Sequence, residues 1–151
     1  MKKEALLIET ISQNIKTLAV QVDKKLTAHL KAQGITLTGT QLAVLGMVYD
    51  RHGAQLLQKE VETRLHLSHP TTRGIIKRLV NLQLLVTSAP ATDKRQVALQ
   101  LTESGRQLFA HYQPGLTTSA ALLEERLLAG LTDEEIATLR KVLPQMVANL
   151  A

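Results

Sequence analysis

The chain has 151 residues, of which 44% are hydrophobic, and a formal net charge of +5 at pH 7, which suits one globular domain with a packed core. It contains no cysteine, and this excludes disulfides, thiolate metal sites and a cysteine-based redox sensor. Because no run approaches the roughly 20 apolar residues that span a bilayer, and because Glu4 and Glu9 interrupt the apolar stretch that a signal peptide needs, we expect a soluble cytoplasmic protein without a membrane partner.

The first predicted element is a long helix over about 3–31. Its apolar residues recur every three or four positions, which places them along one helical face: Ile8, Ile11, Ile15, Leu18, Val22, Leu26 and Leu30. Gly34 ends this helix. A second helix is predicted to begin after Thr38, to run through Tyr49 and to end before Gly53.

A pair of short helices follows. The first is predicted over 57–65, a tight turn lies at His66 and Leu67, and the second covers 68–82. Ser68 is a suitable N-cap, and Pro70 in the first turn costs little because its missing N–H has no helical partner there. Two helices joined by a tight turn are typical of a helix-turn-helix, whose second helix enters the DNA major groove.

A hairpin is predicted over 84–101. Two apolar runs, 84–87 and 96–101, are separated by a polar loop that holds Asp93, Lys94 and Arg95. A basic-tipped hairpin directly after the second short helix is the layout of a winged helix-turn-helix.

The C-terminal third is predicted to be helical. One helix begins at Thr102 and runs towards residue 128, and Pro114 with Gly115 should bend or break it. The last helix begins at Thr132, where Glu135 completes a capping box, and Pro144 is expected to kink it. The fold class is therefore mainly α with a small β-hairpin wing, in a single domain covering 1–151.

The positive charge is concentrated in the middle of the chain. Residues 51–106 hold nine basic and four acidic residues, a formal +5, whereas residues 1–50 carry +2 and residues 107–151 carry −2. Lys and Arg supply most non-specific DNA affinity by neutralising phosphates. The charge therefore favours DNA binding by the predicted winged segment, and a merely solvated basic surface is the alternative.

The helix predicted over 68–82 carries the candidate readout residues. Its inward side chains are expected to be Ile75, Ile76 and Leu79. Arg73 is placed to contact a guanine edge, threonine methyl groups to touch thymine methyls, and Lys77 and Arg78 to contact phosphates. A phosphate is also expected at Ser68 and the first backbone N–H groups. The predicted DNA-facing side chains of this helix are Ser68, His69, Thr71, Thr72, Arg73, Lys77 and Arg78.

The tip of the hairpin is the second candidate contact. Arg95, beside Lys94, is predicted to enter the narrow minor groove, where negative potential is enhanced. Asp93 is expected to orient the Arg95 guanidinium by a charge-assisted pair. The alternative is a simple turn in which Asp93 caps the loop.

Residues 37–105 resemble the MarR family of winged helix-turn-helix transcription regulators. The resemblance rests on LTGTQLAVL (37–45), LSHPTTRGIIKRL (67–79), the DKR wing tip (93–95) and LTESG (101–105). Two positions depart from the family pattern: Gln83 and His66 stand where glycine is common, so their backbones are expected to carry some strain.

The resemblance implies a homodimer formed by long helices over 1–35 and 107–151, with a DNA-binding lobe over 37–105. The dimer would present two recognition helices and two wings to a pseudo-palindromic operator. Carried over from the family, Thr71, Thr72, Arg73 and Lys77 face the major groove, and Arg95 the minor groove. The apolar stripes of the terminal helices have few partners within one chain, which also favours a dimer. Packing within a single chain is the alternative.

A small effector, often aromatic or phenolic, is also implied by the resemblance, in a cleft between the dimer helices and the DNA lobe. Candidate lining residues, each of which also fits a plain core role, are Leu18, Val22, Met47, Phe109 and Tyr112. The five histidines lack the spacing of a metal site, so neither a metal nor a cofactor is expected.

The sequence thus predicts a homodimeric, sequence-specific transcription regulator, a repressor that a small ligand releases from DNA. An enzyme is not expected, because neither a Ser/His/Asp constellation nor a Gly-rich phosphate loop is present. A helical interaction module or a non-specific nucleic-acid binder remains the alternative. Salt-dependent binding to one specific duplex would distinguish the first reading from the alternative.

Overall fold

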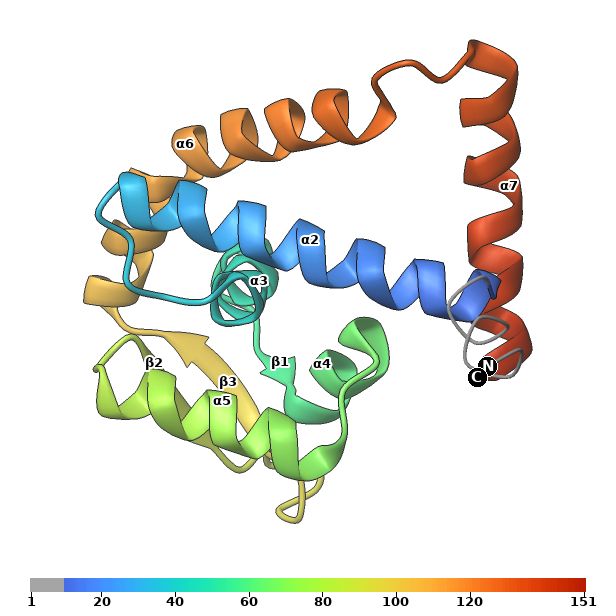
Figure 1. Ribbon diagram of the computed structural model, residues 1–151. Helices are drawn as coiled ribbons and strands as arrows, with labels where there is room; N and C mark the ends of the chain where they lie inside the picture. The colour runs from blue at the N-terminus through green and yellow to red at the C-terminus, as the bar shows by residue number, and fades with distance from the viewer. Residues whose placement is uncertain (1–9) are drawn as a thin grey trace, which may run out of the picture.

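The computed structural model describes residues 10–151 and places helices around a small sheet (Figure 1). Its helices are α2 (Ile11–Ala32), α3 (Gly39–Tyr49), α4 (Gln58–Leu65), α5 (His69–Asn81), α6 (Glu103–Leu128) and α7 (Asp133–Leu150). The strands are β1 (Leu56–Leu57), β2 (Leu85–Ser88) and β3 (Ala98–Leu101). The expected fold class, mainly α with a β-hairpin wing, is confirmed. The predicted start of the first helix near residue 3 lies outside the described residues.

A hydroxyl side chain caps the start of every described helix except α4, which begins after Leu57. The side chain before the helix accepts a hydrogen bond from the backbone N–H three residues on, which satisfies one of the unpaired donors of the first turn. At α3 and α7 a Gln or Glu also reaches back to the cap, so both have complete capping boxes, including the predicted Thr132–Glu135 pair. The capping residues are Thr10, Thr38, Ser68, Thr102 and Thr132.

The sheet contains one strand more than predicted. Strands β2 and β3 form the expected antiparallel hairpin, with Leu85 opposite Leu101. On the other side of β3 lies β1, with Leu56 opposite Leu99, so the order is β1-β3-β2. Leu57 was predicted to be helical and is instead the second residue of β1, and α4 begins one residue later. A two-residue strand is too short to show the alternation that marks strands in a sequence.

Among the described residues, three that are not glycine adopt left-handed backbone conformations, and two of them, His66 and Gln83, end helices of the winged lobe. His66 has φ +52° after α4, and Gln83 has φ +59° after α5. At both turns a backbone N–H reaches back to the helix, from Leu67 to Glu62 and from Leu84 to Leu79, which satisfies carbonyls that the helix end leaves free. At these two positions the MarR family commonly has glycine, and the strained backbone that was expected for His66 and Gln83 is confirmed.

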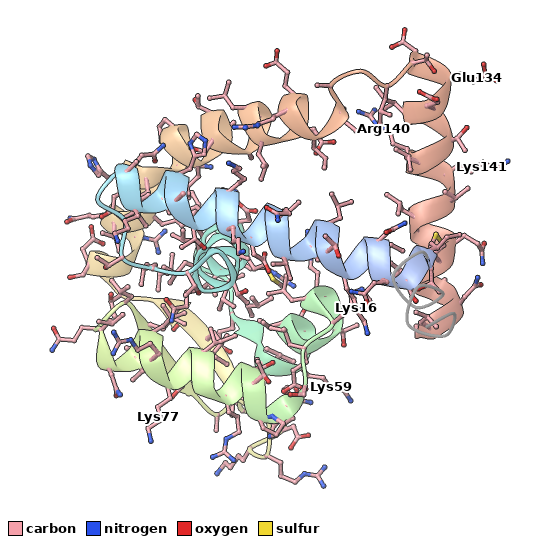
Figure 2. The ribbon with its side chains drawn as sticks, viewed as in Figure 1. Lys16, Lys59, Lys77, Glu134, Arg140 and Lys141 are labelled. Carbon is pink, nitrogen blue, oxygen red and sulfur yellow. The ribbon has the colours of Figure 1, made fainter. Side chains whose placement is uncertain are left out.

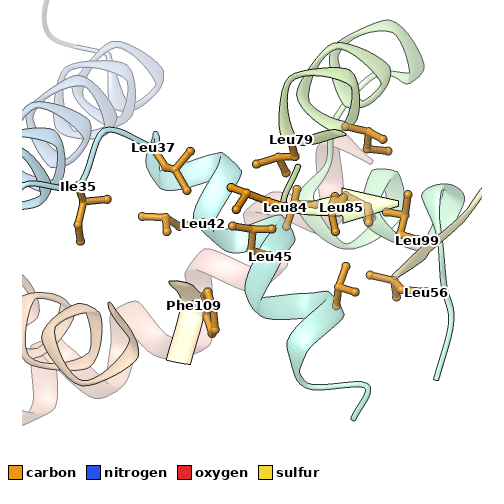
Figure 3. Close-up of a cluster of buried hydrophobic side chains, with 14 of the residues drawn as sticks. Ile35, Leu37, Leu42, Leu45, Leu56, Leu79, Leu84, Leu85, Leu99 and Phe109 are labelled. Carbon is orange, nitrogen blue, oxygen red and sulfur yellow. The ribbon is translucent and has the colours of Figure 1, made fainter. Parts of the chain in front are cut away.

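The hydrophobic core lies within the winged lobe (Figure 3). Side chains from α3, α5 and the sheet meet there, among them Leu45, Leu79 and Leu99, all fully buried. Phe109 of α6 extends this core, and its ring lies 5.1 Å from that of Tyr49. In contrast, α7 contributes no buried residue. The lobe is therefore well packed within one chain, α2 and α6 add single buried side chains such as Leu30 and Phe109, and α7 adds none.

The long helices extend away from the lobe (Figure 1). Helix α6 continues through Pro114 and changes direction near its middle, so the proline bends the helix and does not break it. The hydroxyls of Thr117 and Thr118 donate to carbonyls four residues earlier, which favours such a bend. Gln33 at the end of α2 donates to Ser119, and this bond ties α2 to α6. No helix in residues 10–151 is both long and apolar enough to cross a membrane.

Candidate nucleic-acid interface

Helices α4 and α5 form the predicted helix-turn-helix, and the β2–β3 hairpin lies beside it. Ser68 caps α5: its hydroxyl oxygen accepts from the Thr71 N–H at 3.3 Å and donates to the Thr71 hydroxyl at 2.8 Å. Both side chains are exposed. The N-terminal end of α5 and the hairpin tip occupy the same edge of the molecule, away from α6 and α7 (Figure 1).

The outward face of α5 is basic. Arg73, Lys77 and Arg78 are exposed, and within residues 10–151 none of them forms an ion pair. Lys77 extends away from the core into solvent (Figure 2). Three cations without an acidic partner are available to neutralise phosphates or to bind base edges.

Thr72 does not belong to this face, and the prediction that it contacts DNA is wrong. Its side chain is 0% exposed, and its hydroxyl donates to the Ser68 carbonyl at 2.9 Å. Thr72 precedes Ile76 by four residues and Leu79 by seven, a spacing that puts all three on one helical stripe. Ile76 and Leu79 are buried as predicted, whereas Ile75 is half-buried.

His69 stands at the start of α5, where it contacts α4. Its Nδ1 lies 2.7 Å from the Glu62 carboxylate, and the Gln58 amide nitrogen lies within 3.2 Å of the same ring atom. Gln58 and Glu62 are not among the interface residues predicted from the sequence. Their spacing of four residues, which puts two polar side chains together on one helix face, is the signal that marks them.

At the wing tip, Asp93 both caps the turn and orients the Arg95 guanidinium, two roles that were predicted as alternatives. Its Oδ1 accepts from the Arg95 backbone N–H at 3.0 Å, which caps the turn, and from Arg95 Nε at 3.2 Å, which orients the guanidinium. The backbone bond is the main reason why the pKa of Asp93 lies below its ordinary value. The Arg95 side chain is 91% exposed, and Lys94 beside it is also exposed.

The five predicted effector-lining residues do not meet in one cavity of the single chain. Leu18 lines an apolar groove of about 610 Å³ between α2, α6 and α7. Met47 lines a separate pocket of about 500 Å³ beside α4. Phe109 is buried in the core, and Val22 and Tyr112 are half-buried. Within residues 10–151, no three His, Asp or Glu side chains come together as a metal site would require.

Known proteins resemble this chain in sequence and in fold. Residues 33–96 match the model of the MarR family. The HTH-type transcriptional regulator MhqR of Bacillus subtilis (strain 168) is 27% identical over 128 residues, which span 85% of this chain and 83% of MhqR.

Two solved structures share the fold. The DNA complex of S. aureus MepR has a TM-score of 0.76 at 23% identity and covers 93% of this chain and 98% of its own. Bordetella bronchiseptica BpsR, whose DNA binding is regulated by 6-hydroxynicotinic acid, has a TM-score of 0.75 at 23% identity and covers 93% and 94%. The family match falls on the winged lobe and the fold similarity extends over the flanking helices, so the chain is similar to the winged-helix transcription regulators of the MarR family.

Proposed function

We propose that the protein is a homodimeric repressor that binds a pseudo-palindromic operator and is released by a small aromatic effector. The observation that carries the proposal is the basic face of α5, whose exposed cations lack acidic partners within the described residues and lie beside an exposed basic wing tip. Helix α5 enters the major groove, and the wing reaches the adjacent minor groove.

The contacts divide into readout and positioning. Arg73 makes a bidentate contact to a guanine edge, and the Thr71 methyl group packs on a thymine methyl. Lys77, Arg78 and Lys94 bind phosphates, and the capped start of α5 at Ser68 holds another. Arg95, already oriented by Asp93, occupies the minor groove.

The homodimer is supported by the surface of the single chain. It exposes 11112 Å², whereas a compact monomer of 16.6 kDa exposes roughly 7,600 Å². This surface includes an apolar groove of about 610 Å³ formed by side chains of α2, α6 and α7. A second copy that covers these helices buries an area typical of obligate dimers. Residues 1–35 and 107–151 thus act in dimerisation, and residues 37–105 form the DNA-binding lobe.

For the effector we propose a site between the dimer helices and the lobe. The lining residues that we propose are the half-buried Val22, Met47 and Tyr112 together with Leu18 and Phe109, which do not share one cavity in the single chain. BpsR, with its response to 6-hydroxynicotinic acid, supports an aromatic ligand. By binding one spacing of the two lobes better than the other, such a ligand shifts the dimer away from the DNA-binding arrangement.

Selection of random duplexes by the purified protein tests this function. We expect an inverted repeat whose half-sites are about one helical turn apart, roughly 34–36 Å. Recovery of DNA without sequence preference, with a steep salt dependence, would instead favour the non-specific binder. A helical interaction module predicts no enrichment and no such salt slope.

Substitution of the two arginines should separate readout from positioning. Arg73→Ala is expected to weaken operator binding by about 1–3 kcal/mol and to relax the preference at one base position. Arg95→Ala is expected to weaken binding to all A·T-rich variants of the site alike. Fluorescence anisotropy titrations on a set of single-base operator variants measure both effects.

Lys141→Ala is the matched control, because Lys141 points away from the body of the molecule on α7 (Figure 2). It removes one positive charge far from the interface and should leave operator affinity unchanged. Full operator affinity in both arginine variants would show that the groove assignment is wrong.

A further inference from the structure

An acidic residue, Glu62, lies at the proposed DNA-binding surface, where negative charge is unfavourable. Glu62 of α4 stands directly against the start of α5, and its side chain is 20% exposed. A carboxylate near the phosphate backbone opposes binding by charge repulsion. The contacts that Glu62 makes indicate a role that compensates for this repulsion.

Three side chains form a polar cluster between the two helices of the motif. The Gln58 amide donates to Glu62 Oε1 at 2.9 Å, and His69 Nδ1 lies 2.7 Å from the same oxygen. A carboxylate oxygen accepts only, so His69 Nδ1 carries a proton and donates it. The Gln58 nitrogen is also 3.2 Å from His69 Nδ1, but both atoms are donors in this arrangement. The shorter, charge-assisted bond to Glu62 therefore prevails.

The cluster is anchored on the inside and open on the outside. Gln58 is only 6% exposed, and its backbone N–H donates to the Val97 carbonyl at 2.8 Å, at the base of the wing. The Gln58 bond is the main reason why the pKa of Glu62 lies below its ordinary value, and the His69 contact adds to it. The imidazole itself is 64% exposed. With Nδ1 turned inward to Glu62, Nε2 is the ring nitrogen left for an outside partner.

We propose that Glu62, held by Gln58, is a positioning residue that fixes the orientation and tautomer of His69, and that His69 Nε2 is thereby a specificity-determining contact to DNA. This inference rests on the proposed function. In the neutral ring, a proton on Nδ1 makes Nε2 an acceptor. In the major groove the partners of an acceptor are the amino groups of adenine and cytosine. Glu62 thus contributes to sequence preference without contacting DNA, and its bond offsets the repulsion of its charge.

The matched pair of variants is Glu62→Ala and Glu60→Ala. Both remove one negative charge from α4, but Glu60 contacts Arg51 and the Leu57 N–H and does not touch His69. Loss of charge alone predicts equal or tighter DNA binding for both. The proposal predicts that Glu62→Ala binds the operator roughly tenfold more weakly and loses its preference for adenine or cytosine at one position, as His69→Ala does. Glu62→Gln, which keeps an acceptor oxygen without the charge, should lie between wild type and Glu62→Ala.

Long-range ¹H–¹⁵N spectra of the free protein at pH 8 report the tautomer of His69 directly. The measurement requires no DNA and does not confuse a loss of folding with a change of tautomer. We expect a protonated Nδ1 in wild type and Glu60→Ala, and a mixture of tautomers in Glu62→Ala. An unchanged His69 spectrum in Glu62→Ala, or operator binding as tight as that of Glu60→Ala, would overturn the proposal. If wild-type protein selects no duplex, the proposed function fails, while the spectra still decide whether Glu62 positions the ring.

Discussion

Leu143→Glu is expected to be a monomer that binds the operator at least ~100-fold more weakly than wild type, because only two linked lobes engage both half-sites at once. Leu143 lines the apolar groove of α2, α6 and α7 and is 45% exposed in the single chain. A carboxylate there costs the monomer little but would be buried and unpaired in the proposed dimer. Sedimentation equilibrium at micromolar concentration, together with operator titration, measures both effects.

Gln145→Glu controls for the added charge. It places the same carboxylate on α7, two residues after Leu143. Residue 145 lies four positions after Lys141, which points outward (Figure 2), so both residues are on the same outward face of the helix. This variant should remain dimeric with nearly full operator affinity. If Leu143→Glu also stayed dimeric, the terminal helices would not form the interface, and the excess surface of the chain would need another partner.

The helix boundaries were largely predictable because they depend on local chemistry. Thr132 with Glu135 and Ser68 with Pro70 mark helix starts through side-chain bonds to the first backbone N–H groups. Strand β1 was not predictable in this way. Its two residues are held by pairing with Leu99 and Ala98, some forty positions along the chain, and no local pattern encodes such a partner.

The candidate interface was predicted in part. The charge of Arg73, Lys77 and Arg78 marked the outward face of α5, but the polar character of Thr72 concealed its inward position, which only the spacing to Ile76 and Leu79 reveals. A buried threonine satisfies its hydroxyl on the preceding turn, so polarity alone does not indicate exposure. The contact of Glu62 with His69 depends on the angle between two helices, which composition and periodicity do not specify.

Gly105→Ala is expected to lower the free energy of unfolding by about 3 kcal/mol, at the upper end of overpacking costs. A Cβ at this position would overlap the Leu84 carbonyl oxygen and would lie 3.2 Å from a Leu101 methyl. The carbonyl has little freedom to retreat, because it accepts the Thr102 N–H. The Thr102 hydroxyl holds the neighbouring Gln83 carbonyl at 2.6 Å. These bonds join the start of the wing to the start of α6. A shift of the Leu84 carbonyl that made room for the Cβ would therefore break them.

Gly74→Ala is the matched control, because a Cβ there meets nothing within 4 Å on the exposed face of α5. It should raise stability by up to about 1 kcal/mol through helix propensity. Denaturant unfolding of both variants and wild type at one protein concentration compares them, since the stability of a dimer depends on concentration. An unfolding midpoint of Gly105→Ala equal to that of wild type would mean that α6 does not pack this closely on the wing. The LTESG glycine would then have no steric reason to be glycine.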